Sequence, residues 1–219
     1  MMQKGATLVH LMAACRRLGE PPVGRTTIVK MSYLCEVLRP AYELWTRTFK
    51  FVRYFYGPYS SELLGYLDYL VFHGLVSVRS YTRSDTGVLA LYEASDEGVG
   101  ASEQLRKVDG GETLYALAED VVWSLQVLGV RTAKQICDVV YAEPQFESVL
   151  RDAEVRGIPS SSAEPLLSSQ DPRHPAFRIQ ALLRSQADGF TPRKLVETYL
   201  RYIALRAKSP SLRRAEAVV

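Results

Sequence analysis

The chain has 219 residues, with 27 Lys and Arg against 24 Asp and Glu, and 47% of its residues are hydrophobic. A chain of this length and apolar content can bury a real core, which excludes disorder along its whole length. It has no run of about 18 apolar residues and no convincing signal-peptide pattern, so we expect a soluble cytoplasmic protein without membrane contact. The three cysteines are far apart in the sequence, so the pattern predicts neither a disulfide framework nor a metal site.

The charges form three blocks along the chain. Residues 1–95 carry 11 basic and 7 acidic side chains, residues 96–170 carry 6 and 13, and residues 171–219 carry 10 and 4. Such a chain can bind a polyanion with its basic ends, or its blocks can neutralise one another. The second interpretation is favoured, because the excess of positive charge in the first block is small for a nucleic-acid-binding domain.

The first 95 residues predict a mixture of helices and strands. Apolar spacing predicts helices over 6–18 and from a cap at Thr26 or Thr27 to about Leu38. Alternating aromatic residues predict a strand over 49–56, which Gly57-Pro58 ends. A further helix, capped by Ser60 or Ser61, runs to His73 and stops at Gly74. Two β-type runs, 75–81 and 88–92, then form a hairpin around the turn at 82–87.

The rest of the chain is predicted to be helical. Amphipathic spacing indicates a helix over Thr113–Leu128, and Thr132 caps the next one. Residues 157–175 are rich in Ser and Pro and are typical of a linker. Two helices follow, Ala176–Ala187 and one that opens with Thr191-Pro192, where proline suits the first helical position.

The order helix, helix, strand, helix, hairpin is that of a winged helix, a variant of the helix-turn-helix. We therefore predict an α+β, mostly helical fold, in which segments 49–56, 75–81 and 88–92 form a small antiparallel sheet. The predicted organisation is a winged-helix-like domain over 1–95, an acidic helical segment over 96–156, the linker over 157–175, and basic C-terminal helices with a tail over 176–219. We expect these parts to fold as one compact unit.

One segment resembles a known bacterial and archaeal family. Its residues are Tyr56, Gly57, Pro58, Tyr59, Ser60, Leu63, Leu67, Leu70, Gly74 and Leu75, preceded by Lys30 and followed much later by Val139-Val-Tyr141. This "YGPYS…L…L…L…GL" pattern is similar to the signature of the phage-associated, Panacea and YwgA-like proteins. The resemblance covers the first 95 residues and implies a winged-helix-like fold, no established enzymatic activity, and roles as antitoxins or regulators of mobile elements.

The helix after Pro58 occupies the place of a DNA-recognition helix, yet it lacks the usual base-reading residues. Between Pro58 and Val78 there is no Arg, Lys, Asn or Gln, whereas DNA readers use these residues for base edges and phosphates. One face of the helix instead carries Tyr59, Tyr66, Tyr69 and His73. These rings either pack against neighbouring helices or form a surface for a protein partner, since Tyr is enriched at interface hot spots.

The basic residues offer a rival interpretation. Five of them could contact a DNA backbone, from the first helix, the aromatic strand and the hairpin: Arg16, Arg17, Lys50, Arg79 and Arg83. Phosphate contacts of this kind position a protein without reading sequence. The competing interpretation is ordinary surface charge.

We find no catalytic motif, because the three histidines are dispersed and no HExxH, GxSxG or P-loop occurs. The sequence therefore predicts a non-enzyme without catalytic residues, metal or cofactor. The first hypothesis is a regulatory protein of antitoxin or adaptor type that binds another protein, a toxin or a regulatory target, with a homodimer as a further possibility. The second is a DNA-binding transcriptional regulator that uses the hairpin and the basic ends.

Overall fold

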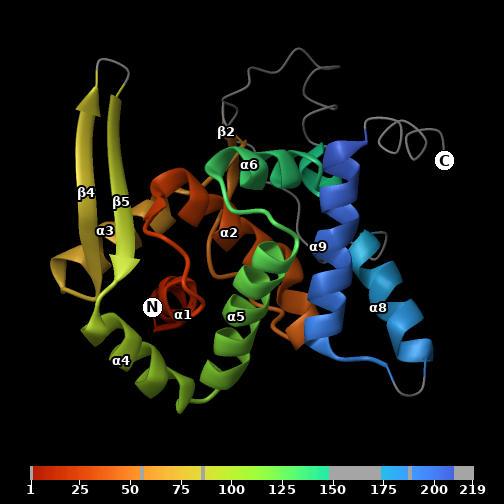
Figure 1. The fold of residues 1–219 in the computed structure, drawn as a ribbon. Coiled ribbons are helices and arrows are strands. Elements are labelled where there is room, and N and C mark those ends of the chain that lie inside the picture. Colours follow the sequence, from red (N-terminus) through yellow and green to blue (C-terminus); the bar gives the residue numbers. More distant parts are fainter. Residues whose placement is uncertain (1, 55–56, 85–86, 148–173, 187–188, 210–219) are drawn as a thin grey trace.

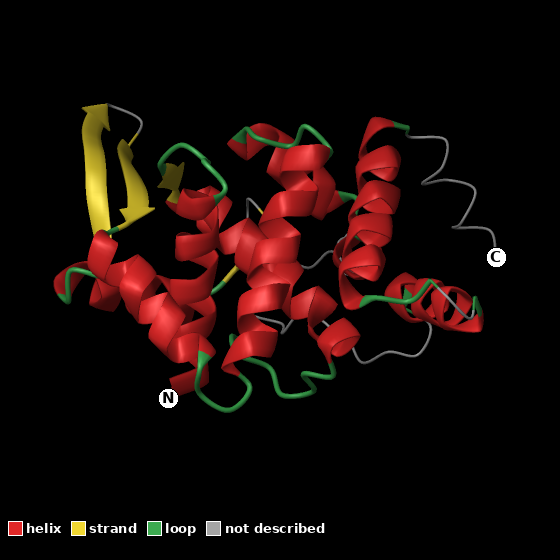
Figure 2. Cartoon of the chain, turned by 60° about the horizontal axis from the view of Figure 1, so that its bottom comes forward, coloured by secondary structure: helices red, strands yellow, loops and turns green. Residues whose placement is uncertain are grey.

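The computed structural model describes residues 2–54, 57–84, 87–147, 174–186 and 189–209. The described chain is mostly helical, with two small antiparallel sheets (Figures 1 and 2). The helices are α1 (Met2–Arg17), α2 (Arg25–Leu38), the 3₁₀ turn η1 (Arg39–Tyr42), α3 (Ser61–Phe72), α4 (Asp96–Arg106), α5 (Gly111–Val127), α6 (Ala133–Tyr141), α8 (Pro175–Ser185) and α9 (Pro192–Lys208). The strands are β1 (Val23–Gly24), β2 (Val52–Tyr54), β3 (Gly57–Tyr59), β4 (Val76–Ser84) and β5 (Gly87–Ala94).

Helix ends that depend on local chemistry agree with the sequence. The Ser60 hydroxyl accepts a hydrogen bond from the Leu63 amide at 3.2 Å, and Gly74 ends α3 with a φ of +71°. Thr132 and Gln135 form a capping box at α6, and Thr191 caps α9. Each cap satisfies an amide that the first helical turn leaves without a backbone acceptor.

The predicted cap of α2 is wrong. This helix begins at Arg25, its N-cap is Gly24, and no side chain caps it. The cause is tertiary, because Gly24 pairs with Leu91 as part of β1 and is therefore extended immediately before the helix begins. Neither Thr26 nor Thr27 has the non-helical backbone that an N-cap needs.

The hairpin is confirmed, but the predicted third strand of its sheet is wrong. Strands β4 and β5 pair from Val76↔Ala94 to Ser84↔Gly87, and the other neighbour of β5 is β1. The expected strand 49–56 is reduced to β2, which pairs with β3 in a separate two-stranded sheet.

Two features explain this arrangement. Phe49, Phe51 and Arg53 are buried while Lys50 and Tyr54 are exposed, so the predicted alternation is kept, but only residues 52–54 pair as a strand. Gly57, with a φ of +97°, pairs with Tyr54 as the first residue of β3, and Pro58 continues in this strand instead of ending one. Proline is tolerated because a two-stranded sheet consists of edge strands only.

Helix α4 lies in the segment 96–156 that was predicted to be helical, but its bounds were not predicted. The Ser95 hydroxyl accepts from the Gly98 amide at 2.9 Å and donates to the Gly74 carbonyl at 2.6 Å. A Cβ at Gly98 would lie 2.0 Å from the carbonyl oxygen of Leu75, so only glycine allows α4 to approach the start of β4 so closely. The Ser-Asp-Glu sequence at 95–97 is the local signal for this helix start.

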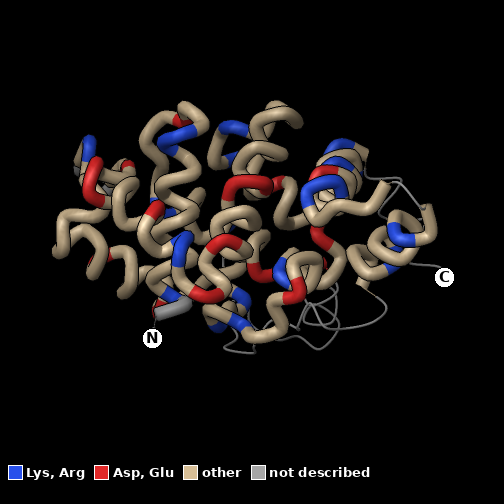
Figure 3. Tube along the Cα trace, turned by 90° about the horizontal axis from the view of Figure 1, so that it is seen from below, with Lys and Arg blue, Asp and Glu red and all other residues tan. Residues whose placement is uncertain are grey.

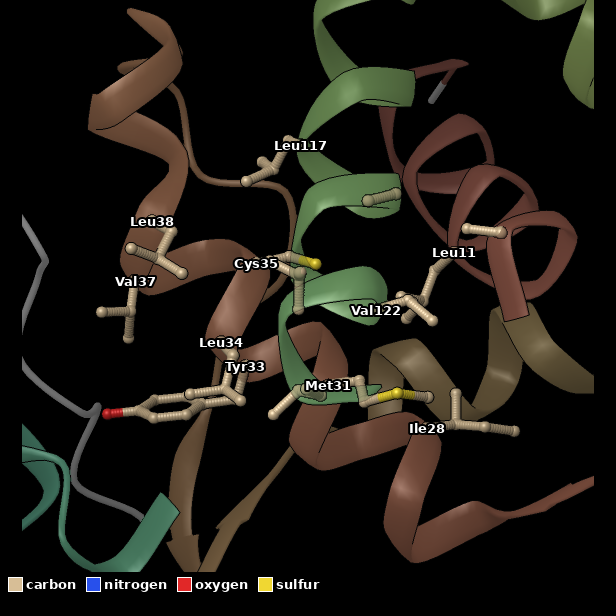
Figure 4. Packing of buried hydrophobic residues seen from close by; sticks show 14 of the residues in the cluster. Leu11, Ile28, Met31, Tyr33, Leu34, Cys35, Val37, Leu38, Leu117 and Val122 are labelled. Atoms are coloured by element: carbon tan, nitrogen blue, oxygen red, sulfur yellow. The ribbon is translucent and has the colours of Figure 1, made fainter. Parts of the chain in front are cut away.

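Helix α2 is the centre of a single hydrophobic cluster. Its residues from Thr27 to Leu38 are all buried, and Figure 4 shows several of them against Leu117 and Val122 of α5 and Leu11 of α1. The cluster continues through α5 to α9, so the first 95 residues and the C-terminal helices share one core. The predicted linker lies outside the described residues except for its last two, of which His174 caps α8.

Figure 1 places the β4–β5 hairpin at one side of the molecule and helices α8 and α9 at the opposite side. Among the described helices, none is both long and apolar enough to cross a membrane.

Candidate functional site: the surface of α3 and the buried polar groups

Helix α3 is held to the core by one face. Leu63, Leu67 and Leu70 are almost fully buried, and the i, i+4, i+7 spacing places them on a single stripe. Its two acidic residues are ion-paired, Glu62 with Lys4 of α1 and Asp68 with Arg25 of α2. With both carboxylates paired, the remaining face of α3 carries little net charge.

The structure separates the four predicted interaction residues. The Tyr66 ring is half-buried and lies edge-on to Phe49, with 6.0 Å between the ring centroids. Tyr59 is half-buried beside Tyr54, with 4.9 Å between the centroids. These two tyrosines therefore pack against other parts of the protein and do not form a common outer face with Tyr69.

Tyr69 and His73 do lie together on the surface. Their ring centroids are 4.2 Å apart, and 55% of Tyr69 is exposed. Phe72, which sequence analysis missed, is 84% exposed and makes an edge-on contact with His73 at 5.2 Å. The signal was present in the sequence, because Phe72 follows Tyr69 by three residues and so shares its side of the helix. We call Tyr69, Phe72 and His73 the aromatic end of α3.

Three of the five predicted DNA contacts are already paired with carboxylates. Arg16 pairs with Asp96 at 2.5 Å and Arg79 with Glu93 at 2.5 Å. Arg17 lies 3.6 Å from a carboxylate oxygen of Glu103 and stacks over the ring of Tyr115. Exposed pairs of this kind contribute little to stability, but they reduce the local positive potential.

The other two candidate cations lie near β2 and in β4. Lys50 is exposed just before β2, and Arg83 lies near the tip of β4 opposite Val88, where its side chain is outside the described part. Figure 3 shows positive and negative residues interspersed along the trace. Of the four candidate cations whose side chains are described, three are therefore paired with carboxylates.

A buried polar group with four hydrogen-bond partners is Glu143, which the sequence did not single out. Its carboxylate accepts from the hydroxyls of Tyr33 and Tyr199 at 2.8 Å each, and from the Phe146 amide at 2.9 Å. His174 lies 2.9 Å away, and since its Nδ1 accepts from the Ala176 amide, its Nε2 carries the proton that is donated to Glu143.

This network is a buried structural centre. The side chains of Glu143 and His174 are 0% exposed. Burial by itself raises the pKa of Glu143, but the hydrogen bonds from His174, Phe146 and Tyr199 outweigh it and hold the pKa below its usual value. The network joins α2 to α8 and α9 through one carboxylate. The Glu-Pro pair at 143–144, typical of a helix start, is the signal that could have indicated it.

A second buried group lies between α1, α4 and α5. The His10 ring is 0% exposed, its Nδ1 is 2.9 Å from the Ser102 hydroxyl, and its edge meets Tyr115. Burial and the nearby positive charge of Arg17 lower the pKa of His10 to about 4, so it is neutral at physiological pH. Arg17 and Arg106 stack on the Tyr115 ring, at 4.4 and 4.3 Å from its centroid. This arrangement shields His10 from solvent.

Three segments of the family-like pattern meet at Lys30. The Lys30 ammonium donates to the Pro58 carbonyl at 2.9 Å. A Cβ on Gly57 would lie 2.8 Å from Lys30 Nζ and 2.6 Å from the Tyr141 ring. The upstream lysine, the Gly-Pro pair of β3 and the later tyrosine are therefore in contact although they are far apart in the sequence.

Within the described residues, no group of three or more His, Cys, Asp or Glu side chains is placed to hold a metal ion. Neither protein-family models nor curated proteins match this chain.

Proposed function

We propose that this chain is a non-catalytic regulatory protein of antitoxin or adaptor type that binds another protein through the aromatic end of α3. The proposal includes a winged-helix-like N-terminal part. It is supported by the order α1, β1, α2, α3, β4, β5, with β1, β5 and β4 in one antiparallel sheet, which resembles a winged helix with the β2–β3 hairpin inserted between α2 and α3.

The observation that carries the proposal is the exposure of Phe72. A phenylalanine with 84% of its surface in water, next to a 55% exposed tyrosine, leaves a compact apolar surface uncovered. Aromatic residues of this kind act as anchors in protein interfaces, where they fill a pocket of the partner.

The charge distribution favours a protein partner over DNA. A nucleic-acid interface needs unpaired cations that release counterions when they bind phosphate. Arg16, Arg17 and Arg79 instead face carboxylates of this chain. On α3 itself, the residues beside Phe72 are aromatic, and the acidic residues are ion-paired.

The test uses a photoreactive benzoylphenylalanine in place of Phe72, in cells that normally make the protein. We expect one crosslinked protein of defined mass, competed by excess wild-type protein but not by Phe72→Ala. The matched control carries the same photoreactive residue at Leu205 of α9, which is 55% exposed, and should not give this product. With the purified partner, Phe72→Ala and Tyr69→Ala should each weaken binding by about 1–2 kcal/mol.

Three results would count against the proposal. The same crosslinks at both positions would mean that the aromatic end of α3 is not selective. A product containing only this chain would make the surface a homodimer interface. Salt-sensitive DNA binding that is lost on combining Arg79→Ala with Arg83→Ala, and kept in Phe72→Ala, would favour the transcriptional regulator.

A further inference from the structure

A pocket of about 190 Å³ lies between α2, the β2–β3 hairpin and the start of α3. Arg25, Thr26 and Lys30 give it a polar side, while Tyr54, Tyr59 and Leu64 contribute ring and aliphatic surface. It is separate from the aromatic end of α3, which contributes none of the lining residues.

The Lys30 side chain in this pocket is a buried cation without a counter-ion among the described residues. The residue is 3% exposed, and the Pro58 carbonyl is the one acceptor that the described structure gives its ammonium group. No carboxylate of the described residues lies within 4.0 Å of its nitrogen, the separation that defines an ion pair. A buried ammonium that lacks an anionic partner is costly, and one carbonyl satisfies only one of its three donors.

The surrounding groups do not supply the missing negative charge. Burial lowers the pKa of Lys30 to about 8, so the amine is still mostly protonated at neutral pH. The thiol of Cys137 acts electrostatically on Lys30, but burial raises the pKa of that thiol. It is therefore neutral at the same pH.

Gly57 of β3 lies against the ammonium at the pocket wall. With a φ of +97° and Lys30 Nζ 2.8 Å from the position of a Cβ, this residue has to be glycine for the hairpin to approach α2. The first turn of α2, from Arg25 onward, begins beside the pocket without a side-chain cap, so its amide dipoles also favour negative charge there.

We propose that this pocket binds a small molecule with one anionic head, a carboxylate or a phosphate, and a flat apolar body. The head would pair with Lys30 and approach Thr26, and the body would lie against Tyr54, Tyr59 and Leu64. Arg25, at the edge of the pocket, is already paired with Asp68 at 2.6 Å. The size fits a single ring, since a cavity of about 150 Å³ is enough for benzene.

The first experiment titrates the full-length protein with benzoate, phenyl phosphate and benzamide, and follows binding by NMR chemical shifts. Benzamide has the shape of benzoate without its charge, so we expect it to bind at least tenfold more weakly. The ratio of benzoate to phenyl phosphate affinity identifies which anionic head the pocket prefers. If neither anion binds at 10 mM, or if benzamide binds as tightly as benzoate, the proposal is wrong.

The second experiment compares Lys30→Met with Lys194→Met, which removes the same charge from an exposed position of α9. Lys30→Met should abolish the preference for the anions, and Lys194→Met should leave it unchanged. Unchanged benzoate affinity in Lys30→Met would overturn the proposal.

A measurement on the wild-type chain keeps the proposal testable if Lys30→Met does not fold. Raising the pH from 7 to 9.5 takes Lys30 through its pKa of about 8 and removes most of its charge. Benzoate affinity should then fall by roughly thirtyfold, while benzamide affinity stays constant. A benzoate affinity that does not change over this range would show that Lys30 does not hold the anion.

Discussion

The buried carboxylate of Glu143 gives the sharpest prediction of stability. Tyr199→Phe removes one hydroxyl and keeps the ring, so Glu143 loses the 2.8 Å hydrogen bond to Oε1 and keeps its contacts with His174 and Tyr33. Both Tyr199 and Glu143 are 0% exposed, so water cannot replace the lost donor. A hydrogen bond to a charged group contributes about 1.5–3 kcal/mol, and we expect Tyr199→Phe to lower the free energy of unfolding by ~2 kcal/mol at pH 7.

The measurement is the free energy of unfolding in urea. Tyr69→Phe is the control, because Tyr69 is 55% exposed and the loss of its hydroxyl should change the free energy of unfolding little. The pKa of Glu143 in the folded protein is below its usual value, so its contribution to stability is present above the unfolded pKa and is lost as the pH falls through the folded pKa. The difference between wild type and Tyr199→Phe should therefore shrink in acid. A Tyr199→Phe protein within about 0.5 kcal/mol of wild type, or a difference that does not change with pH, would refute this account of Glu143.

Three further predictions concern the rest of the fold. Gly57→Ala should lower the free energy of unfolding in urea by about 2–4 kcal/mol, because a Cβ there would be 2.6 Å from a ring atom of Tyr141. The control Gly65→Ala, where a Cβ would meet nothing within 4 Å, should raise the free energy of unfolding by about 0.5–1 kcal/mol. The pKa of His10 is lowered to about 4 in the folded protein, so the stability due to its neutral form should be lost as the pH falls from 6.5 toward 4, by ~3 kcal/mol in all. Thermal unfolding should show this loss in wild type and not in His10→Gln. Phe72→Ala should leave the free energy of unfolding within about 0.5 kcal/mol of wild type. Leu67→Ala, which empties a fully buried site, should lower the free energy of unfolding by about 2–5 kcal/mol. A large effect of Phe72→Ala would contradict the exposure of this residue.

The sequence by itself determined the features that depend on neighbours along the chain. Ser60, Thr132 and Thr191 cap helices as predicted, because each cap needs only a hydroxyl and an amide three residues later. The hairpin was predictable for the same reason, since two β-type runs joined by a short polar turn pair with each other before any other strand is needed.

Tertiary structure decided which partners distant segments have. The two residues of β1 carry no strand pattern of their own and become a strand only because β5 lies beside them. The aromatic alternation of 49–56 correctly predicted that Phe49 and Phe51 face the core, where they contact Tyr66 and Tyr33. It did not predict that only residues 52–54 find a strand partner, because that depends on where β3 lies.

Contacts between distant segments also decided which predicted site residues are exposed. Tyr66 and Tyr69 have the same chemistry and lie on the same helix, but Phe49 covers only Tyr66, and no local pattern predicts that contact. Lys30 and Glu143 each look like ordinary surface charges in the sequence. They became buried because segments tens of residues away fold over them, and the energetic cost of that burial is a property of the assembled core and not of the local sequence.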